Sequence, residues 1–269
     1  MRGRVLVIAG SDSGGGAGIQ ADIKTIAALG GYCCTAVTSV TAQDTTGMHG
    51  VVAMSPEFVR LQAETALADI GADAVKIGML GSVAVIETVA AVLKGRALGV
   101  PTVLDPVMVA KGGARLLDRD ALSALKRYLL PNAMLLTPNV PEAEALTGFE
   151  IVDLAAMRRA AEALLTLGVP AVLLKGGHLP GPVVVDMLAT ADDLALLERP
   201  RIETRHTHGT GCTLASAVAA GLAQGMGLRA AVVRARAYVQ AAIAAAPGFG
   251  RGHGPLNHNV RLDAIAALD

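Results

Sequence analysis

A seven-residue loop, residues 207–213 with the sequence T-H-G-T-G-C-T, carries the clearest chemical signal in the chain. Gly209 and Gly211 leave the backbone around Thr210 open, and the apolar run that follows predicts a helix whose first N–H groups point back at the loop, so the loop can bind an anion. Cys212 lies at the predicted helix N-terminus, where the dipole is expected to lower the pKa of its thiol and make it a base or a nucleophile. An anion site beside a proton acceptor suggests group transfer.

Carboxylates and a lysine follow other short apolar runs. Asp105 would face a metal ion or a phosphate-bound water, or would cap the turn before a proline. Asn139 is expected to cap the next helix, and Glu142 near the start of that helix is suited to holding Mg²⁺ through waters. Lys175 precedes two glycines, and a phosphate partner is expected because burying its charge unpaired would be costly.

Three other loops contain candidate binding residues. The glycine-dense turn of residues 10–22 leads into a helix with Asp22 in its early turns; it holds a G-x-G-x-x-A fragment, but the acidic partner of a dinucleotide site is missing. Gln43 presents a donor and an acceptor that match an aminopyrimidine, or it satisfies the backbone of its own loop. Lys111 and its neighbouring glycines suggest a mobile flap, or an exposed lysine with no special role.

Alternating short β-branched runs and longer helical patterns predict one α/β domain over residues 1–269, with a mostly parallel sheet covered by helices on both faces. The expected buried strands are residues 5–9, 36–40, 74–77, 102–104, 134–137 and 171–175. Residues 183–198 predict an antiparallel hairpin at one sheet edge. A helix is expected to begin at Ser55, and Gly168 is expected to follow the end of another helix in a left-handed conformation.

Composition narrows the class of protein. The 269 residues include 52% hydrophobic residues, enough for a continuous core, and 23 basic residues balance 23 acidic ones. Without a polybasic run and with only 2% aromatic residues, nucleic acid is not an expected partner. No apolar run is long enough to span a bilayer, so we expect no membrane association and a cytoplasmic location. The three cysteines predict reduced thiols, with the Cys33–Cys34 pair serving core packing.

The candidate residues belong together because ligands gather at the carboxyl ends of parallel strands. An anion-binding loop, two carboxylates, a lysine and a proton acceptor at one sheet edge favour phosphoryl transfer, in which positioning and charge neutralisation supply most of the catalysis. The Walker pattern G-x-x-x-x-G-K-[ST] is absent from the sequence. The glycine loop before Cys212 is therefore the expected phosphate site.

The order and spacing of these segments resemble the ribokinase-like kinases, and within them the hydroxymethylpyrimidine/phosphomethylpyrimidine kinase family of thiamine biosynthesis. The resemblance covers nearly the whole chain and rests on AGSDSGGGAGIQADIK, AQDTTG, KIGML, LDPVMVAK, TPNVPEA, LKGGH, THGTGCT and GRGHGPLNH. It implies a three-layer α/β/α fold and an enzyme that transfers the γ-phosphoryl of Mg-ATP to 4-amino-5-hydroxymethyl-2-methylpyrimidine and then to its monophosphate. It also implies a homodimer.

The same resemblance implies roles for individual residues. Cys212 would be the catalytic base, and Gly209, Thr210 and Gly211 would form the anion hole. The pyrimidine would be bound by Gly10, Asp22, Gln43, Met79 and Val107. ATP and its phosphates would be bound by Lys111, Asn139 and Lys175, and the metal ion by Asp105 and Glu142.

Several alternatives stay open at this point. A pyridoxine or pyridoxal kinase has a similar hydroxymethyl acceptor on a flat ring, and a non-catalytic pyrimidine-binding protein would keep the same fold. A cysteine-protease interpretation of Cys212 with His208 has little support from their spacing. Residues 248–258 predict an irregular surface segment, or alternatively a functional lid. The sequence leaves the role of His206, a need for a monovalent cation and the identity of the lid undetermined.

Overall fold

The computed structural model describes residues 2–108 and 119–260, and in these residues nine strands form a single sheet. The strands are β1 (Arg4–Asp12), β2 (Tyr32–Gln43), β3 (Met48–Ala53), β4 (Ala74–Ile77), β5 (Thr102–Leu104), β6 (Leu135–Leu136), β7 (Ala171–Leu174), β8 (Val183–Thr190) and β9 (Leu194–Pro200). Their order is β3-β2-β1-β4-β5-β6-β7-β8-β9. Strands β2, β1, β4, β5, β6 and β7 run parallel, whereas β3, β8 and β9 pair antiparallel with their neighbours.

The sequence pattern therefore predicted the architecture correctly. Every expected buried strand is present, and β8 with β9 forms the expected hairpin. Strand β3 was missed because its residues are mostly exposed and lack the apolar signal of a buried strand. Gln43, expected in a loop, is instead the last residue of β2.

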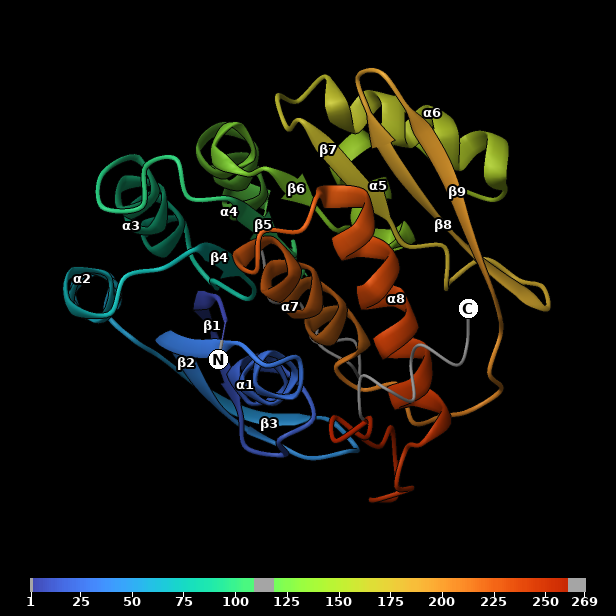
Figure 1. The fold of residues 1–269 in the computed structure, drawn as a ribbon, viewed down its shortest axis with the longest axis horizontal. Coiled ribbons are helices and arrows are strands. Elements are labelled where there is room, and N and C mark those ends of the chain that lie inside the picture. The colour runs from blue at the N-terminus through green and yellow to red at the C-terminus, as the bar shows by residue number, and fades with distance from the viewer. Residues whose placement is uncertain (1, 109–118, 261–269) are drawn as a thin grey trace.

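Helices cover both faces of the sheet (Figure 1). They are α1 (Gly18–Ala28), α2 (Pro56–Asp69), α3 (Val83–Lys94), α4 (Arg119–Ala124), α5 (Val140–Thr147), α6 (Leu154–Leu165), α7 (Thr210–Ala223) and α8 (Leu228–Ala244), with a π-helical turn η1 (Leu125–Leu129) and a 3₁₀ turn η2 (Leu130–Asn132) after α4. Ser55 caps α2 as expected, because its side chain accepts a hydrogen bond from the Phe58 N–H. Gly168 follows α6 with φ +95°, the left-handed conformation that favours glycine.

Two hydrophobic cores, one on each face of the sheet, hold the layers together. One core contains buried residues of α2, α3, α5 and α6, and the other contains those of α1, α7 and α8. Strand β1 contributes to both, since its side chains alternate: Leu6 and Ile8 lie in the first core, and Val5 and Val7 lie in the second. This is the three-layer α/β/α arrangement expected from the sequence.

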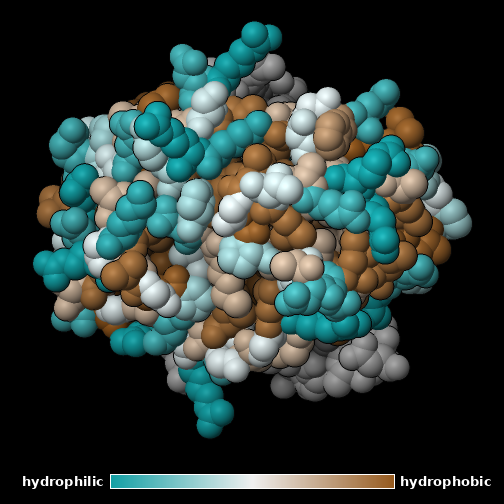
Figure 2. Space-filling model, turned by 90° about the horizontal axis from the view of Figure 1, so that it is seen from above, coloured by the Kyte–Doolittle hydropathy of each residue, from teal (hydrophilic) through white to brown (hydrophobic). Residues whose placement is uncertain are grey.

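The outer surface mixes hydrophilic and hydrophobic side chains, as the face shown in Figure 2 illustrates. At the sheet edge, Val40 of β2 pairs with Val52 of β3 across the two strands. Val40 is 46% exposed and Val52 is 66% exposed. Within the described residues, no helix is long and apolar enough to cross a membrane.

The strand order creates a crevice at the carboxyl end of the sheet. From β1 the chain passes to β2 on one side, and later returns to β4 on the other side of β1. Loops that leave β1 and β4 therefore diverge, and such a switch point is where ligands bind in open parallel sheets. The N-terminus of α7 lies at this same edge.

Candidate active site

A cavity of about 1030 Å³ opens at the carboxyl ends of the strands. It is lined by residues that follow β1, β4, β5, β6 and β7 and by the loop before α7. The expected site residues Gly10, Gln43, Met79, Asp105, Val107, Asn139, Glu142, Lys175, Gly209, Thr210, Gly211 and Cys212 all line it. The structure thus brings together, at one sheet edge, residues that are up to 202 positions apart in the sequence.

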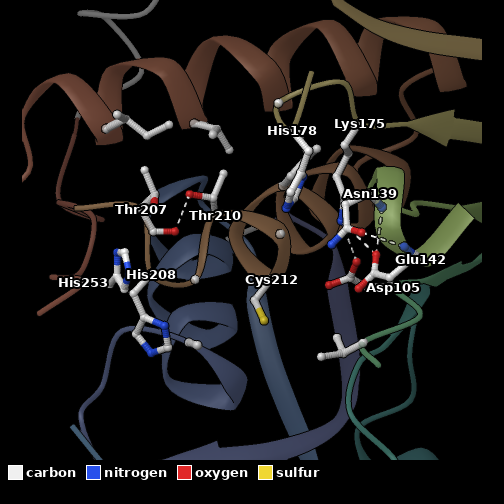
Figure 3. A pocket seen from close by; sticks show the side chains of 18 of the residues that line it. Asp105, Asn139, Glu142, Lys175, His178, Thr207, His208, Thr210, Cys212 and His253 are labelled. Carbon is white, nitrogen blue, oxygen red and sulfur yellow. Dashed lines mark hydrogen bonds and ion pairs between the residues drawn. The ribbon is translucent and has the colours of Figure 1, made fainter. Parts of the chain in front are cut away.

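Lys175 lies at the centre of a charged cluster on one side of the cavity (Figure 3). Its Nζ is 2.9 Å from Asp105 Oδ1 and 3.9 Å from Glu142 Oε2. Thr137 Oγ1 also donates to Asp105 Oδ1, at 3.1 Å. Burial would lower the pKa of Lys175, but the charges of Asp105 and Glu142 outweigh it and raise that pKa, so the lysine stays charged.

Asn139 and Glu142 also form the N-terminal cap of α5. Asn139 Oδ1 accepts from the Glu142 N–H, and Glu142 Oε2 accepts from the Asn139 N–H, both at 2.8 Å. The expected capping role of Asn139 is confirmed, which leaves its side-chain amide N–H groups rather than its oxygen for a ligand. Burial, joined by the charge of Asp105, raises the pKa of Glu142 to about 7 in spite of Lys175.

The glycine loop meets the charged cluster from the opposite side. Helix α7 begins at Thr210, and Gly209 precedes it with φ +84°. A Cβ added at Gly211 would lie 3.2 Å from Lys175 Nζ and 3.5 Å from Asp105 Oδ2. The first N–H groups of α7, the lysine and a carboxylate therefore surround one small volume, which suits an anion together with its counter-ion.

Cys212 lies in the first turn of α7 and points into the cavity (Figure 3), but the expected lowering of its pKa is wrong. Burial raises the pKa of the thiol to about 11, and nearby Asp22 and Asp105 add to the effect. The Lys76 charge and a hydrogen bond involving the Gly18 backbone act in the opposite direction without offsetting it. Desolvation of the thiolate, which the sequence pattern does not reveal, outweighs the position at the helix terminus.

Asp22 does not reach the cavity surface, so its expected contact with a pyrimidine is not supported. The residue is fully buried, and both its carboxylate oxygens lie 2.9 Å from Lys76 Nζ. Ser216 Oγ on α7 donates to Asp22 Oδ1 at 2.7 Å. Lys76, although fully buried, is among the residues that surround the cavity, and Asp22 is not.

Two residues that were not predicted as site residues organise the first glycine turn. Asp12, the last residue of β1, accepts hydrogen bonds from the N–H groups of Gly14, Gly16 and Ala17 at 2.8–3.1 Å. Its Oδ2 lies 2.9 Å from His208 Nε2, and Gln43 Nε2 lies 3.4 Å from that same ring nitrogen. The sequence did contain a signal for this role of Asp12. An acidic residue precedes a run of glycines, and no side chain shields the N–H groups of those glycines. Burial would raise the pKa of Asp12, but its hydrogen bonds, first the one with His208, lower it.

Residues 248–258 are irregular, as expected: residues 248–251 and 253 are exposed at the surface, whereas Gly254, Leu256 and His258 are buried. His253 N–H donates to the Thr45 carbonyl at 2.7 Å, and His208 N–H donates to the Gly254 carbonyl at 3.1 Å. His258 is buried, with Nε2 3.0 Å from Thr213 Oγ1. The segment thereby joins the turn after β2 to the loop before α7.

The remaining candidates have different outcomes. Lys111 lies outside the described residues. His206 has a buried Nδ1 atom with no hydrogen-bond partner among the described residues. Cys33 and Cys34 are free thiols packed against the two cores, which agrees with the packing role expected for them.

The charged cluster supplies only some of the ligands that a magnesium ion needs. Asp105 and Glu142 supply two carboxylates, and the described residues contain no group of three or more acidic, histidine or cysteine side chains that could hold a metal. Mg²⁺ is usually held by one or two carboxylates, with water and phosphate oxygens completing its shell. The donor set therefore suits an ion that arrives with a phosphorylated ligand.

Comparisons with known proteins agree with the geometry. The sequence profile of a family described as phosphomethylpyrimidine kinase matches residues 12–257. The chain is 50% identical to a hydroxymethylpyrimidine/phosphomethylpyrimidine kinase of Rhizobium meliloti, over 94% of this chain and 96% of that protein. It is 52% identical to a thiamine biosynthesis bifunctional protein of Geobacter sulfurreducens, of which it spans about half the length, 54%.

Two solved structures illustrate the similarity in fold. A pyridoxal kinase from Bacillus subtilis, in an ADP complex, superposes with a TM-score of 0.89 at 35% identity and covers the whole of both chains, 100%. A phosphomethylpyrimidine kinase from Clostridium difficile superposes with a TM-score of 0.78 at 40% identity, over 88% of this chain and 97% of that one. The expected ribokinase-like fold is confirmed.

Proposed function

We propose that this chain, which belongs to the phosphomethylpyrimidine kinase family, transfers the γ-phosphoryl group of ATP to 4-amino-5-hydroxymethyl-2-methylpyrimidine and then to the resulting monophosphate. The observation that carries the proposal is the meeting of the N-terminus of α7 with Lys175 and Asp105 in one cavity. Preorganised N–H groups and a lysine stabilise the charge of a phosphoryl group in transfer.

The phosphate end of the site would be formed by the α7 N-terminus and Lys175. Asp105 and Glu142 would hold Mg²⁺, which supplies charge neutralisation at the phosphates when it is bound. Asn139 would donate its amide hydrogens to a phosphate oxygen, since its own oxygen caps α5. Lys175 lies beside both carboxylates, 2.9 Å from Asp105 and 3.9 Å from Glu142.

The acceptor end would be formed by Gln43, Met79, Val107 and the backbone at Gly10. A Cβ added at Gly10 would lie 2.9 Å from Ser39 Oγ and would also crowd the Met79 side chain, so glycine lets the backbone pack closely there. Cys212 would accept the proton of the hydroxymethyl group. The oxygen of that group would bond to the γ-phosphorus of ATP as the bond between this phosphorus and the departing ADP breaks. The thiol is protonated at neutral pH, so this step should accelerate as pH rises.

Turnover measured with two acceptors tests the proposal. Steady-state kcat/KM is compared for the aminopyrimidine and for pyridoxal, each with Mg-ATP. We expect the aminopyrimidine to be the better substrate and both the monophosphate and the diphosphate to form. A strong preference for pyridoxal would reject the assignment of substrate, and binding of the aminopyrimidine without any turnover would indicate a non-catalytic binding protein.

Pyridoxal kinase is the second candidate, because several pyridoxal kinase structures superpose closely on this chain. The shared fold and cavity suit any flat heteroaromatic ring that carries a hydroxymethyl group. Gln43 favours the aminopyrimidine, because its amide can pair with a ring nitrogen and the adjacent amine at once. Gln43→Leu should therefore reduce kcat/KM for the aminopyrimidine more than for pyridoxal.

A homodimer is also part of the proposal. The exposed apolar pair Val40 and Val52 lies on the outermost two strands of the sheet, where a second copy of the chain could cover it. Sedimentation velocity of the purified protein measures the state directly. A Val52→Lys variant should shift a dimer toward monomer, whereas an unchanged monomer would reject this part of the proposal.

A further inference from the structure

Two turns that are far apart in the sequence meet beside the cavity. The glycine turn of residues 13–17 follows β1, and the loop of residues 207–213 leads into α7. Their backbones lie so close together that a Cβ added at Gly209 would overlap the carbonyl oxygen of Gly16. A Cβ added at Gly16 would lie 2.6 Å from His208 Cδ2. Glycine at both positions is therefore what allows the two turns to meet.

A single carboxylate bridges the two turns. Asp12 Oδ2 accepts the N–H groups of Gly16 and Ala17 at 3.1 and 2.8 Å, and the same oxygen lies 2.9 Å from His208 Nε2. Asp12 is only 3% exposed and His208 only 7%, so water competes little for this contact. Because an ionised carboxylate can only accept hydrogen bonds, the imidazole ring is the donor.

The two turns belong to the two ends of the proposed site. Ser13, the residue after Asp12, is joined to Gln43 of the acceptor end: its hydroxyl donates to the Gln43 carbonyl at 2.9 Å and accepts from the Gln43 N–H at 2.8 Å. His208 directly precedes Gly209, where the phosphate end begins. The contact between Asp12 and His208 therefore connects the residues assigned to the acceptor with those assigned to the phosphoryl group.

We propose that the Asp12–His208 pair is a positioning element that holds the loop before α7 against the glycine turn after β1, and thereby aligns the acceptor hydroxyl with the phosphoryl group. The second half of this statement rests on the proposed function. Neither residue is assigned a proton transfer. Alignment alone has a large effect on rate, because a displacement of about 1 Å between reacting groups can cost roughly 10²-fold.

The fold does not depend on this pair alone. Deeper in the molecule, Ser216 Oγ on α7 donates to Asp22 Oδ1 on α1 at 2.7 Å, which joins the two helices that follow the two turns. Without the imidazole, Asp12 would keep its three hydrogen bonds from backbone N–H groups. Loss of the pair should therefore loosen the loop before α7 while the chain stays folded and each end of the site still binds its own ligand.

Steady-state kinetics with Mg-ATP and the aminopyrimidine separate alignment from binding. His208→Leu should lower kcat by about 10- to 100-fold, while KM for each substrate stays within about threefold of the parent value. His208→Gln keeps an N–H group that can donate to Asp12, so it should recover most of kcat.

Lys24→Met is the matched control. Lys24 Nζ donates to the Gly15 carbonyl at 2.9 Å, so this variant removes an exposed hydrogen bond from the same glycine turn and leaves the Asp12–His208 pair intact. Its kcat should stay within about twofold of the parent value, as is usual for a surface substitution.

Amide hydrogen exchange of the ligand-free chain gives a second measurement that needs no turnover. Mass spectrometry of the peptide that covers residues 207–213 should show exchange at least about tenfold faster in His208→Leu than in the parent chain, and no change in Lys24→Met. Asp12→Ala breaks the same pair from the other side and should also speed exchange. Adding His208→Leu to Asp12→Ala should give little further increase, because the contact is already lost. Circular dichroism reports folding, and Asp12→Ala replaces His208→Leu if the latter does not fold.

Several results would overturn the proposal. A raised KM for the aminopyrimidine with unchanged kcat would mean that His208 acts through Gln43, whose Nε2 lies 3.4 Å from the same ring nitrogen. Unchanged kcat and exchange in His208→Leu, or no recovery of kcat in His208→Gln, would also contradict it. If the parent chain has no turnover with either acceptor but His208→Leu speeds exchange, the proposed function is rejected and the link between the two turns stands.

Discussion

Gly211 offers the sharpest test of the phosphoryl site, because its substitution separates chemistry from stability. An alanine Cβ there would lie 3.2 Å from Lys175 Nζ and 3.5 Å from Asp105 Oδ2, inside the volume that we assign to the transferring group. Alanine in place of glycine favours a helix by up to about 1 kcal/mol, and the lysine terminus need move only slightly to relieve the contact. The free energy of unfolding should therefore change by no more than about 1 kcal/mol.

Activity should respond far more strongly. Loss of one preorganised donor in an anion hole typically costs roughly 10² to 10³ in kcat, and the methyl group would displace the phosphoryl from more than one donor. We expect Gly211→Ala to lower kcat at least about 10²-fold, while the midpoint of thermal unfolding shifts by no more than about 4 °C.

Two other glycines provide matched controls. Gly209 has φ +84°, and a Cβ there would overlap the carbonyl oxygen of Gly16, so Gly209→Ala should destabilise the fold by about 2–4 kcal/mol. Gly225 has φ +83° with open space around it, so Gly225→Ala isolates the backbone cost of about 1–2 kcal/mol. Near-normal kcat in Gly211→Ala would refute the placement of the phosphoryl group. If Gly211→Ala is instead destabilised as much as Gly209→Ala, then Gly211 serves the stability of the loop rather than the phosphoryl site.

Three further outcomes follow from the titrating groups. Cys212→Ala should slow the first phosphorylation by roughly 10² to 10⁴, and the second less, because its phosphate acceptor is already largely ionised; in the parent chain, first-step kcat/KM should rise with pH toward about 11, the raised pKa of the thiol. Burial lowers the pKa of His258 to about 4. As the pH falls below about 6.5, His258 becomes protonated in the unfolded chain, whereas in the folded chain it stays neutral down to about pH 4. Stability should thus fall by up to about 3 kcal/mol across that window, and urea unfolding of His258→Gln should show little such loss. Glu142 has a pKa raised to about 7, so Mg-ATP should bind more tightly as pH rises through that value, and calorimetry on Glu142→Gln should show a flat dependence.

The sequence predicted the buried part of the fold well because burial leaves a pattern. Strands β4 and β5 have the bounds expected from their apolar runs, and the capping box of α5 is visible as Asn139 followed three residues later by Glu142. Strand β3 has no such pattern, because an exposed edge strand does not require apolar alternation. The sequence pattern therefore predicted the sheet but not its edge strand β3.

The candidate site was predicted by residue type more reliably than by role. The glycine loop and Lys175 are recognisable locally, since each needs only its own neighbours to suggest an anion. The pairing of Asp12 with His208 spans 196 positions and depends on tertiary packing. The burial of Asp22 and the desolvation of the Cys212 thiol are likewise properties of the assembled layers, so local spacing assigned them the wrong surroundings.

The packing of residues 248–258 bears on how the protein is made. The segment holds the turn after β2 through Thr45 and holds the loop before α7 through His208, and the Tyr238 hydroxyl donates to the His258 carbonyl at 2.7 Å. A ribosome adds residues one at a time, so most of the sheet can form well before this segment emerges. Until then the two loops lack the hydrogen bonds that this segment makes with Thr45 and His208. Catalytic competence should therefore be acquired abruptly and late in synthesis, and a nascent chain halted before residue 253 would be folded in its core yet inactive.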